Sequence, residues 1–306
     1  MLSYHSIQEL CTEAESRHSS IAAVVLADHV EQLEKPAEVL RAQMAMNLEA
    51  MLESIENGSK AGVRSTSGLT GGDAYRLKER IDAQHALCGD LIANAIQMAI
   101  AVSEINAAMG KIVAAPTAGS CGILPAAMGA LLKVRHVSKD DAVLSLFTAG
   151  AIGMVVAHRA SIAGASGGCQ AECGTAAAMA AACIVELCGG TPQMAADAVA
   201  ITLKCILGLV CDPVAGLVEI PCIKRNASGV SLAFTAAELA LAGIRSAIPA
   251  DEVIDTLKKV GDGMPAALKE TAQGGLAQTP AALALEKHVF GRRTASAVCT
   301  GCSGCV

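Results

Sequence analysis

The sequence has 306 residues, of which 53% are hydrophobic and 17% are charged, and its formal net charge at neutral pH is -6. Nucleic-acid and anionic-membrane partners select basic surfaces, so this balance predicts neither partner and favours an enzyme acting on a small molecule. There is no Trp, and there are only two Tyr and three Phe. Small aliphatic side chains must therefore fill the core, which predicts a mainly α fold with closely packed helices.

Helical patterns alternate with turn-rich segments along the chain. Apolar residues recur with a helical period over Leu40–Ile55, and the pattern ends at Asn57–Gly58. A turn-rich segment, "RSTSGLTGGDAYRL", precedes a second helical pattern in "HALCGDLIANAIQMAIAVSEINAAMG". The chain then forms a short extended or strand-like piece, turns across Pro116–Gly122 and returns to helix near Pro125. The region Pro249–Leu285 is typical of two more amphipathic helices.

The chain has no repeat period and no low-complexity linker. It predicts one large helical catalytic domain with Gly/Pro-rich active-site loops over residues 1–290, followed by a flexible, Cys-rich tail over residues 291–306. The longest uncharged run, Ala142–Ala157, is shorter than the about 20 apolar residues of a membrane span, so we expect a buried core helix there. The N-terminus lacks the apolar stretch of a signal peptide, which predicts a cytoplasmic protein.

Thirteen cysteines are present, and in a reducing cytoplasm they indicate metal binding or catalysis rather than disulfides. Those within helical patterns, Cys11, Cys88, Cys183, Cys188 and Cys205, are expected to pack in the core. Three others stand at Gly- or Pro-marked breaks between helices, where a ligand can approach the backbone: Cys169, Cys211 and Cys222. Either these three converge on one metal centre, or they are thiols of loops and core.

Six dispersed blocks carry a family resemblance. "SGLTGGDA", "EINAAMG", "APTAGSCGILPA", "GGCQAECG", "LGLVCDPVAGLVEIPCIKRNA" and "GGLAQTP" together resemble the alpha chain of bacterial iron-sulfur L-serine dehydratases, from about Ser6 to about Phe290. The resemblance implies a carbon–oxygen lyase that converts L-serine to pyruvate and ammonia without pyridoxal phosphate. It also implies a 4Fe-4S cluster held by Cys169, Cys211 and Cys222, and a smaller beta subunit as partner.

Three cysteine ligands on a four-iron cluster leave one iron open to substrate. We expect that iron to act as a Lewis acid on the serine hydroxyl while a protein base removes the α-proton. His158 is a candidate base, because it ends an apolar helix one loop before Cys169; the alternative is a helix cap or a core histidine. The chain lacks the Ser-Ser-x-His-Thr block of single-chain members, so the base is alternatively supplied by the beta chain.

Two turn-rich segments are candidates for binding the substrate carboxylate, because turns present backbone N–H groups and hydroxyls. The alternative is that they are helix caps, with Thr70 or Asp73 starting the helix that contains Tyr75. Beyond Cys222, Asn226 is a further candidate. The resemblance favours substrate binding, and the predicted substrate residues are Ser65, Ser67, Thr70, Gly71, Gly72, Asp73, Pro116, Thr117, Gly119 and Asn226.

The chain ends in "CTGCSGCV", which places Cys299, Cys302 and Cys305 at three-residue intervals. The spacing is similar to a ferredoxin ligand run, but the fourth ligand, normally a Cys-Pro, is missing. Three interpretations compete: an independent cluster, an unstructured remnant, and a latch. Our hypothesis is the latch, in which the thiolate of Cys305 binds the open iron until serine displaces it.

Other function classes stay open at the level of sequence. A related iron-sulfur lyase would act on L-threonine, L-cysteine or a hydroxy acid. A non-catalytic iron-sulfur carrier would need a fully ligated cluster, which three cysteines do not provide. For a pyridoxal enzyme the best Schiff-base lysine is Lys204 in "TLKCILG", which looks helical, so we expect no pyridoxal phosphate.

Overall fold

A computed structural model describes residues 4–291, and in this part of the chain the fold is helical, with one isolated β-bridge and no strand. The mainly α prediction is therefore confirmed. The helical patterns predicted before Asn57–Gly58, after Pro125 and beyond Pro249 are α3, α6, and the pair α12 and α13. The α-helices are α1 Ile7–Ser16, α2 Ile21–Leu33, α3 Ala37–Gly58, α4 Asp73–Asp82, α5 Gly89–Ala107, α6 Ile123–Ala130, α7 Lys139–Arg159, α8 Gly164–Gly167, α9 Cys169–Leu187, α10 Pro192–Ile206, α11 Cys222–Leu241, α12 Ala250–Gly263 and α13 Pro280–Phe290.

Several helices begin at a hydroxyl side chain that accepts a hydrogen bond from the backbone N–H three residues further on. Such a cap satisfies one of the amides that the first turn leaves unpaired, and loss of one cap typically costs about 1 kcal/mol. In α10 and α13 a proline follows the cap, at a position where its missing N–H costs nothing. The capping residues are Ser6, Ser20, Ser138, Thr191 and Thr279.

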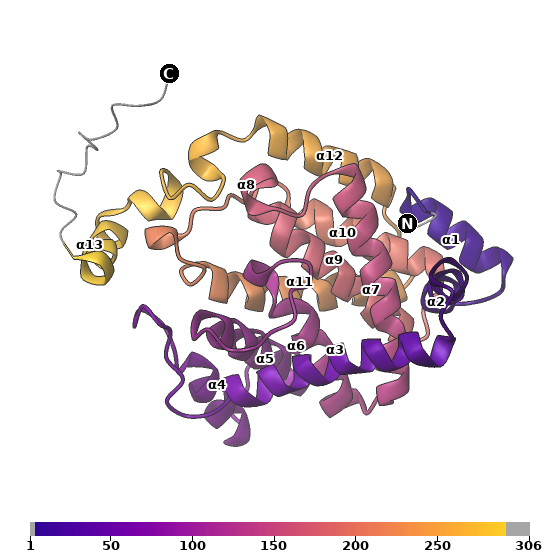
Figure 1. Cartoon of the computed structure of the whole chain (residues 1–306), viewed down its shortest axis with the longest axis horizontal. Helices are drawn as coiled ribbons and strands as arrows, with labels where there is room; N and C mark the ends of the chain where they lie inside the picture. The colour runs from indigo at the N-terminus through magenta and orange to yellow at the C-terminus, as the bar shows by residue number, and fades with distance from the viewer. Residues whose placement is uncertain (1–3, 292–306) are drawn as a thin grey trace.

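Helix α9 is the centre of the fold (Figure 1). It packs against α6, α7, α10 and α11, and every residue from Cys173 to Val185 is buried. Six of these thirteen residues are alanine, so the neighbouring helices approach closely. Helix α7 is long and apolar enough to cross a membrane, but 67% of its apolar stretch is buried inside the protein. The predicted core helix over Ala142–Ala157 is therefore confirmed.

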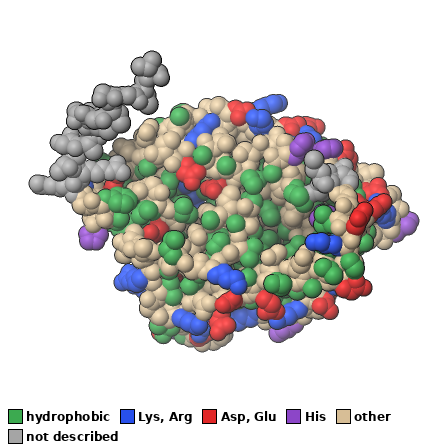
Figure 2. All heavy atoms as spheres, in the orientation of Figure 1, with side chains coloured by type: hydrophobic (Ala, Val, Ile, Leu, Met, Phe, Trp, Pro, Cys, Tyr) green, Lys and Arg blue, Asp and Glu red, His purple; other side chains and the backbone are tan. Residues whose placement is uncertain are grey.

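Two groups of helices meet along α11. Helix α5 packs against α3, α4 and α6, whereas α9 packs against α7 and α10, and α11 contacts both α5 and α9. Helices α1 and α2 lie at one end of the molecule and α13 at the other (Figure 1). On the face drawn in Figure 2, acidic and basic side chains alternate around the edge without a large patch of one sign. This distribution agrees with the expectation of a small-molecule substrate.

Helices α3 and α5 touch backbone to backbone at Gly58. A Cβ at this position would lie 2.0 Å from the carbonyl oxygen of Ala101. We therefore expect Gly58→Ala to lower the free energy of unfolding by about 1–3 kcal/mol or more, because the helices must move apart. The matched control is Gly150→Ala in α7, where nothing lies within 4 Å and alanine should stabilise the helix by about 0.5–1 kcal/mol. Urea unfolding measures both, and equal effects would contradict the close contact.

Candidate functional site

The three cysteines predicted as metal ligands come together at one place. Cys169 is the first residue of α9, Cys222 is the first residue of α11, and Cys211 lies on the irregular segment between α10 and α11. All three are buried, and each lies within electrostatic range of the other two. A fourth thiol, Cys173, lies 3.3 Å from Cys169, measured between the Sγ atoms. The structure thus brings the three thiols into one region, and their binding of a metal stays a prediction.

Hydrogen bonds tie the segment around Cys211 to the start of α9. The buried side chain of Gln170 accepts from the N–H of Gly208 at 2.9 Å and donates to the carbonyl of Leu257 at 3.0 Å. Gly168 precedes the helix with φ +76°, and a Cβ there would lie 2.8 Å from the carbonyl oxygen of Leu209. The glycine is required by both its conformation and this close approach.

Burial sets the protonation of these thiols. It is the main cause that raises the pKa of Cys222 to about 12 and also raises the pKa of Cys211, and neighbouring thiols add to both effects. The pKa of Cys169 is lowered, mainly because of its hydrogen bond with Cys173 and also because the guanidinium of Arg225 lies nearby. The same contact, together with burial, raises the pKa of Cys173.

A largely buried ion pair joins three segments of the site. Arg225 donates to Asp212 Oδ1 at 2.8 Å and to the carbonyl of Val210 at 2.8 Å. The other oxygen of Asp212 accepts from the N–H of Leu276 at 2.7 Å, in the "GGLAQTP" segment. This network holds the Cys211 segment against the first turn of α11 and against the loop before α13.

The donor set consists of thiols, which are the ligands that hold iron-sulfur clusters. Among residues 4–291, no three His, Cys, Asp or Glu side chains gather tightly enough to bind one metal ion. A four-iron cluster presents separate irons to separate thiolates, so its ligands need not close on one point. Three buried thiols from three separate segments, with a single arginine beside them, have the chemistry that such a cluster requires, since coordination deprotonates a thiol outright.

The first predicted substrate segment, residues 65–73, forms a compact turn. Ser65 Oγ accepts from the N–H of Thr70 at 3.2 Å and lies 3.1 Å from Ser67 Oγ, and Thr70 donates to the buried carboxylate of Glu219 at 2.6 Å. The alternative that Thr70 or Asp73 starts the helix containing Tyr75 is confirmed for Asp73. Helix α4 does start at Asp73, but Gly72 precedes it and no side chain of the turn accepts from its first amides.

The first turn of α4 is instead capped from a distance by α5. The buried carboxylate of Glu104 accepts from the N–H groups of Asp73 at 2.8 Å and Ala74 at 3.3 Å. The carbonyl of Ala107, at the end of α5, accepts from the N–H of Thr66 at 3.0 Å. The block "EINAAMG" supplies both Glu104 and Ala107 and thus holds the turn in place, a function that the sequence did not indicate.

The second predicted segment, Pro116–Gly122, is attached to α11 by Asn226. The Oδ1 atom of Asn226 accepts from the N–H of Gly122 at 2.9 Å, and its Nδ2 donates to the carbonyls of Gly119 at 2.8 Å and Cys222 at 2.9 Å. Because these bonds occupy the buried amide, Asn226 positions the segment beside the first turn of α11. Thr117 donates to the carboxylate of Glu172 at 2.8 Å.

Two carboxylates at the site were missed by the sequence interpretation, Glu172 and Glu219. Burial raises the pKa of Glu172, and its bond from Thr117 offsets this only in part. Glu172 stands three residues after Cys169 and Glu219 three residues before Cys222, within blocks that the resemblance covers. Proximity to the cysteines was the available signal, but carboxylates near turns are common at protein surfaces, so sequence position did not distinguish them.

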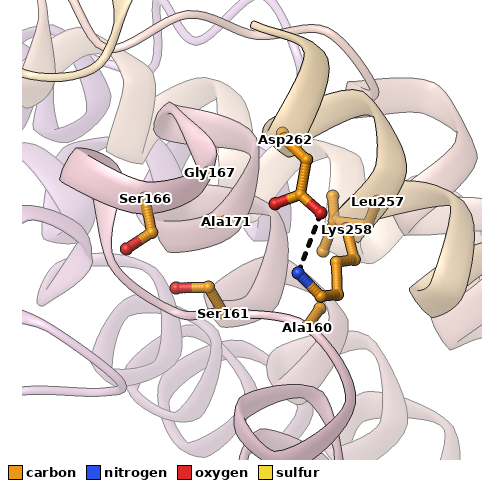
Figure 3. Close-up of a pocket in the computed structure, with 9 residues that line it drawn as sticks. Ala160, Ser161, Ser166, Gly167, Ala171, Leu257, Lys258 and Asp262 are labelled. Atoms are coloured by element: carbon orange, nitrogen blue, oxygen red, sulfur yellow. Dashed lines mark hydrogen bonds and ion pairs between the residues drawn. The ribbon is translucent and has the colours of Figure 1, made fainter. Parts of the chain in front are cut away.

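Two cavities lie near these segments. The larger, of about 530 Å³, is lined on one side by the polar residues Ser67, Asn106 and Glu219 and on the other by Met109 and Val218. Figure 3 shows the second, of about 320 Å³, which is lined by Ser161 and Ser166 and by the Lys258–Asp262 ion pair. None of the predicted substrate residues or metal ligands lines this second cavity.

Three other candidates lie elsewhere. His158 is exposed at the end of α7, and its ring centroid lies 5.0 Å from that of His5, near the N-terminus. Its role as base stays a prediction. Lys204 lies in α10, as its context indicated, and donates to Ser246 at 2.8 Å. Cys305, with Cys299 and Cys302, lies outside the described residues, so the latch also stays a prediction.

Comparisons with known proteins agree on one group. A family model described as serine dehydratase alpha chain matches residues 16–277, a range that includes all three converging cysteines. A probable L-serine dehydratase alpha chain of Bacillus subtilis is 51% identical over 94% of this chain and 96% of its own length. The L-serine dehydratase alpha chain of Peptoniphilus asaccharolyticus is 43% identical, over 89% and 92%. L-serine dehydratase TdcG of Escherichia coli is 37% identical over 90% of this chain but 61% of its own, longer sequence.

We expect Asn226→Ala to loosen the Pro116–Gly122 segment. The change leaves buried backbone groups without partners, which should lower the free energy of unfolding by about 1–3 kcal/mol. Hydrogen exchange at the Gly122 amide should also accelerate, since this amide donates to Asn226. Asn47→Ala, on the exposed side of α3, is the control and should change neither quantity. Slow exchange at Gly122 in the Asn226 variant would show that other contacts hold the segment.

Proposed function

The chain belongs to the serine dehydratase alpha chain family, and we propose that it acts on L-serine through a 4Fe-4S cluster held by Cys169, Cys211 and Cys222. The products are pyruvate and ammonia. The observation that carries the proposal is the convergence of these three buried thiols from three separate segments, beside both predicted substrate turns. The alpha-chain relatives are named as L-serine dehydratases, which supports the substrate.

Elimination of water from serine needs help at two atoms, because hydroxide is a poor leaving group and the α-proton is weakly acidic. A cluster with three cysteine ligands supplies an open iron, a Lewis acid for the hydroxyl. Loss of water gives aminoacrylate, which tautomerises to the imine, and hydrolysis of the imine yields pyruvate and ammonia. The water lost in the elimination is balanced by the water added when the imine is hydrolysed. The overall reaction is therefore redox-neutral and needs no electron acceptor.

The chain's own residues bind and orient the substrate in this proposal. The turn at residues 65–73 offers the hydroxyls of Ser65, Ser67 and Thr70 and the flexible backbone of Gly71 and Gly72 to the substrate carboxylate. Pro116, Thr117 and Gly119 form the facing segment, which Asn226 holds in place. Asp73 lies at the edge of the site, where it pairs with Arg76 and Lys224.

A beta chain is proposed as the partner. The alpha-chain names of the relatives support a separate second subunit, and the longer single-chain relative supports additional sequence outside the matched part. The cavity beside Ser67 and Glu219 opens at exposed apolar side chains, among them Met109 and Val218. Such side chains beside a polar site are suited to contact with a second subunit. We place the enzyme in the cytoplasm, where reduced thiols can hold a cluster.

The ligand assignment predicts which cysteines the cluster needs. We expect Cys169→Ala, Cys211→Ala and Cys222→Ala each to lose most of the iron and sulfide bound after anaerobic reconstitution, and Cys183→Ala to retain it. Cys183 is a matched control, because it is a buried thiol in α9 that donates only to the carbonyl of Ser145. Iron and sulfide analysis with EPR of the reduced protein measures the effect. A chain ending at Phe290 should keep its cluster, and loss of the cluster there would reassign the ligands to the tail.

The partner assignment predicts that the reconstituted chain alone forms little or no pyruvate from L-serine. Addition of a serine dehydratase beta chain should restore activity, because the second subunit completes the site. Pyruvate release measures the rate, and EPR before and after addition confirms that the cluster content is unchanged. Full activity of the chain alone would show that the base lies on this subunit, and His158→Ala would then test the sequence candidate directly.

A further inference from the structure

Glu172 is a carboxylate for which the proposed chemistry has no role so far. It lies in the first turn of α9, and its Oε1 accepts from Thr117 at 2.8 Å. Two glycines allow this carboxylate to approach the backbone closely, because a Cβ on Gly119 would lie 3.1 Å from Oε1 and a Cβ on Gly164 would lie 2.8 Å from Oε2. The carboxylate therefore occupies the space between the Thr117 segment and α8.

The same space borders a proposed metal ligand. A Cβ on Gly164 would also lie 3.1 Å from the Sγ atom of Cys211, so the carboxylate of Glu172 and this thiol face one point. In serine the hydroxyl and the ammonium stand on adjacent carbons. If Cys211 held a metal that bound this hydroxyl, the ammonium on the adjacent carbon would lie close to the Cys211 thiolate, beside which the carboxylate of Glu172 lies.

No cation within the described residues pairs with Glu172. Its hydrogen-bond partner is the neutral Thr117, and the nearby charged group that affects its pKa is another carboxylate, Glu270. Arg225, the guanidinium beside Cys169, is occupied by Asp212 and by the carbonyl of Val210. A carboxylate largely removed from water without a counter-charge is costly, and a cationic ligand offsets that cost.

We propose that Glu172 binds the α-ammonium group of the substrate and makes the site select amino acids over hydroxy acids. This inference rests on the proposed function, because it takes L-serine as the substrate. Under this proposal, the side chain of Glu172 is what distinguishes this chain from a lyase that acts on hydroxy acids. Glu219, the other carboxylate of the site, is less suited to this role because it faces the cavity of Met109 and Val218.

The test compares L-serine with 3-hydroxypropanoate, which keeps the hydroxyl and carboxylate but lacks the ammonium. The reconstituted holoenzyme, with its beta chain, is assayed as wild type, Glu172→Gln, Glu172→Asp and Glu186→Gln. Glutamine keeps the acceptor for Thr117 and removes the charge. Glu186 is a matched control, since it is a buried carboxylate of α9 that accepts from the hydroxyl of Thr148 near the opposite end of the helix.

We expect Glu172→Gln to raise the KM of L-serine about 10- to 100-fold, the usual worth of a charge-assisted hydrogen bond. The inhibition constant of 3-hydroxypropanoate should stay within about twofold. The serine concentration that half-saturates the change in the EPR signal should rise by the same factor as the KM, which measures binding independently of turnover. Glu172→Asp should fall between wild type and Glu172→Gln, and Glu186→Gln should match wild type in both constants.

Two results would overturn the proposal. If Glu172→Gln weakens serine and 3-hydroxypropanoate equally, the side chain only shapes the site. If it lowers kcat while the half-saturating serine concentration stays unchanged, Glu172 acts on the reacting atoms and not on the ammonium. Failure of the proposed function is distinguishable from both, because the wild-type holoenzyme would then release no pyruvate and its EPR signal would not respond to serine.

Discussion

The site depends on two buried amide side chains, which bind the first turns of α9 and α11 to neighbouring segments of the chain. Gln170 joins the start of α9 to the segment that carries Cys211, and Asn226 joins the start of α11 to the Pro116–Gly122 segment. Both side chains have their donors and acceptors satisfied inside the protein, where an unpaired polar group costs about 1–3 kcal/mol. Because each bond connects segments far apart in the chain, the site forms only when the whole helical domain folds.

Small side chains make this arrangement possible. The alanines of α9 allow four helices to surround it, and Gly58, Gly119 and Gly164 allow backbone or carboxylate groups to approach within contact distance. A core built on aromatic side chains would hold the helices further apart. The small side chains that indicated a helical fold therefore also allow the starts of α9 and α11 to lie at one site.

The negative groups of the site have few cations near them. Arg225 compensates Asp212 and lies beside Cys169, whereas Glu172 has no cation among the residues that the structure describes. Cys211 and Cys222 are kept out of water, which favours their protonated form in the absence of a metal. An arrangement with more negative than positive groups is suited to a cluster and to a substrate that carries an ammonium group.

The sequence by itself determined the helical class, the end of α3 at Asn57–Gly58, the return to helix near Pro125, and the three cysteines at breaks between helices. These follow from local patterns: a period in apolar residues, and the preference of glycine and proline for turns. The expectation of core packing was wrong for Cys88, Cys188 and Cys205, which are exposed. The sequence did not identify Glu172, Glu219 or Glu104, nor the role of Asn226 as a brace. Only the tertiary structure decided these, because a carboxylate or amide acquires its function from partners such as Thr117 and Gly122, which lie 55 and 104 residues away in the chain.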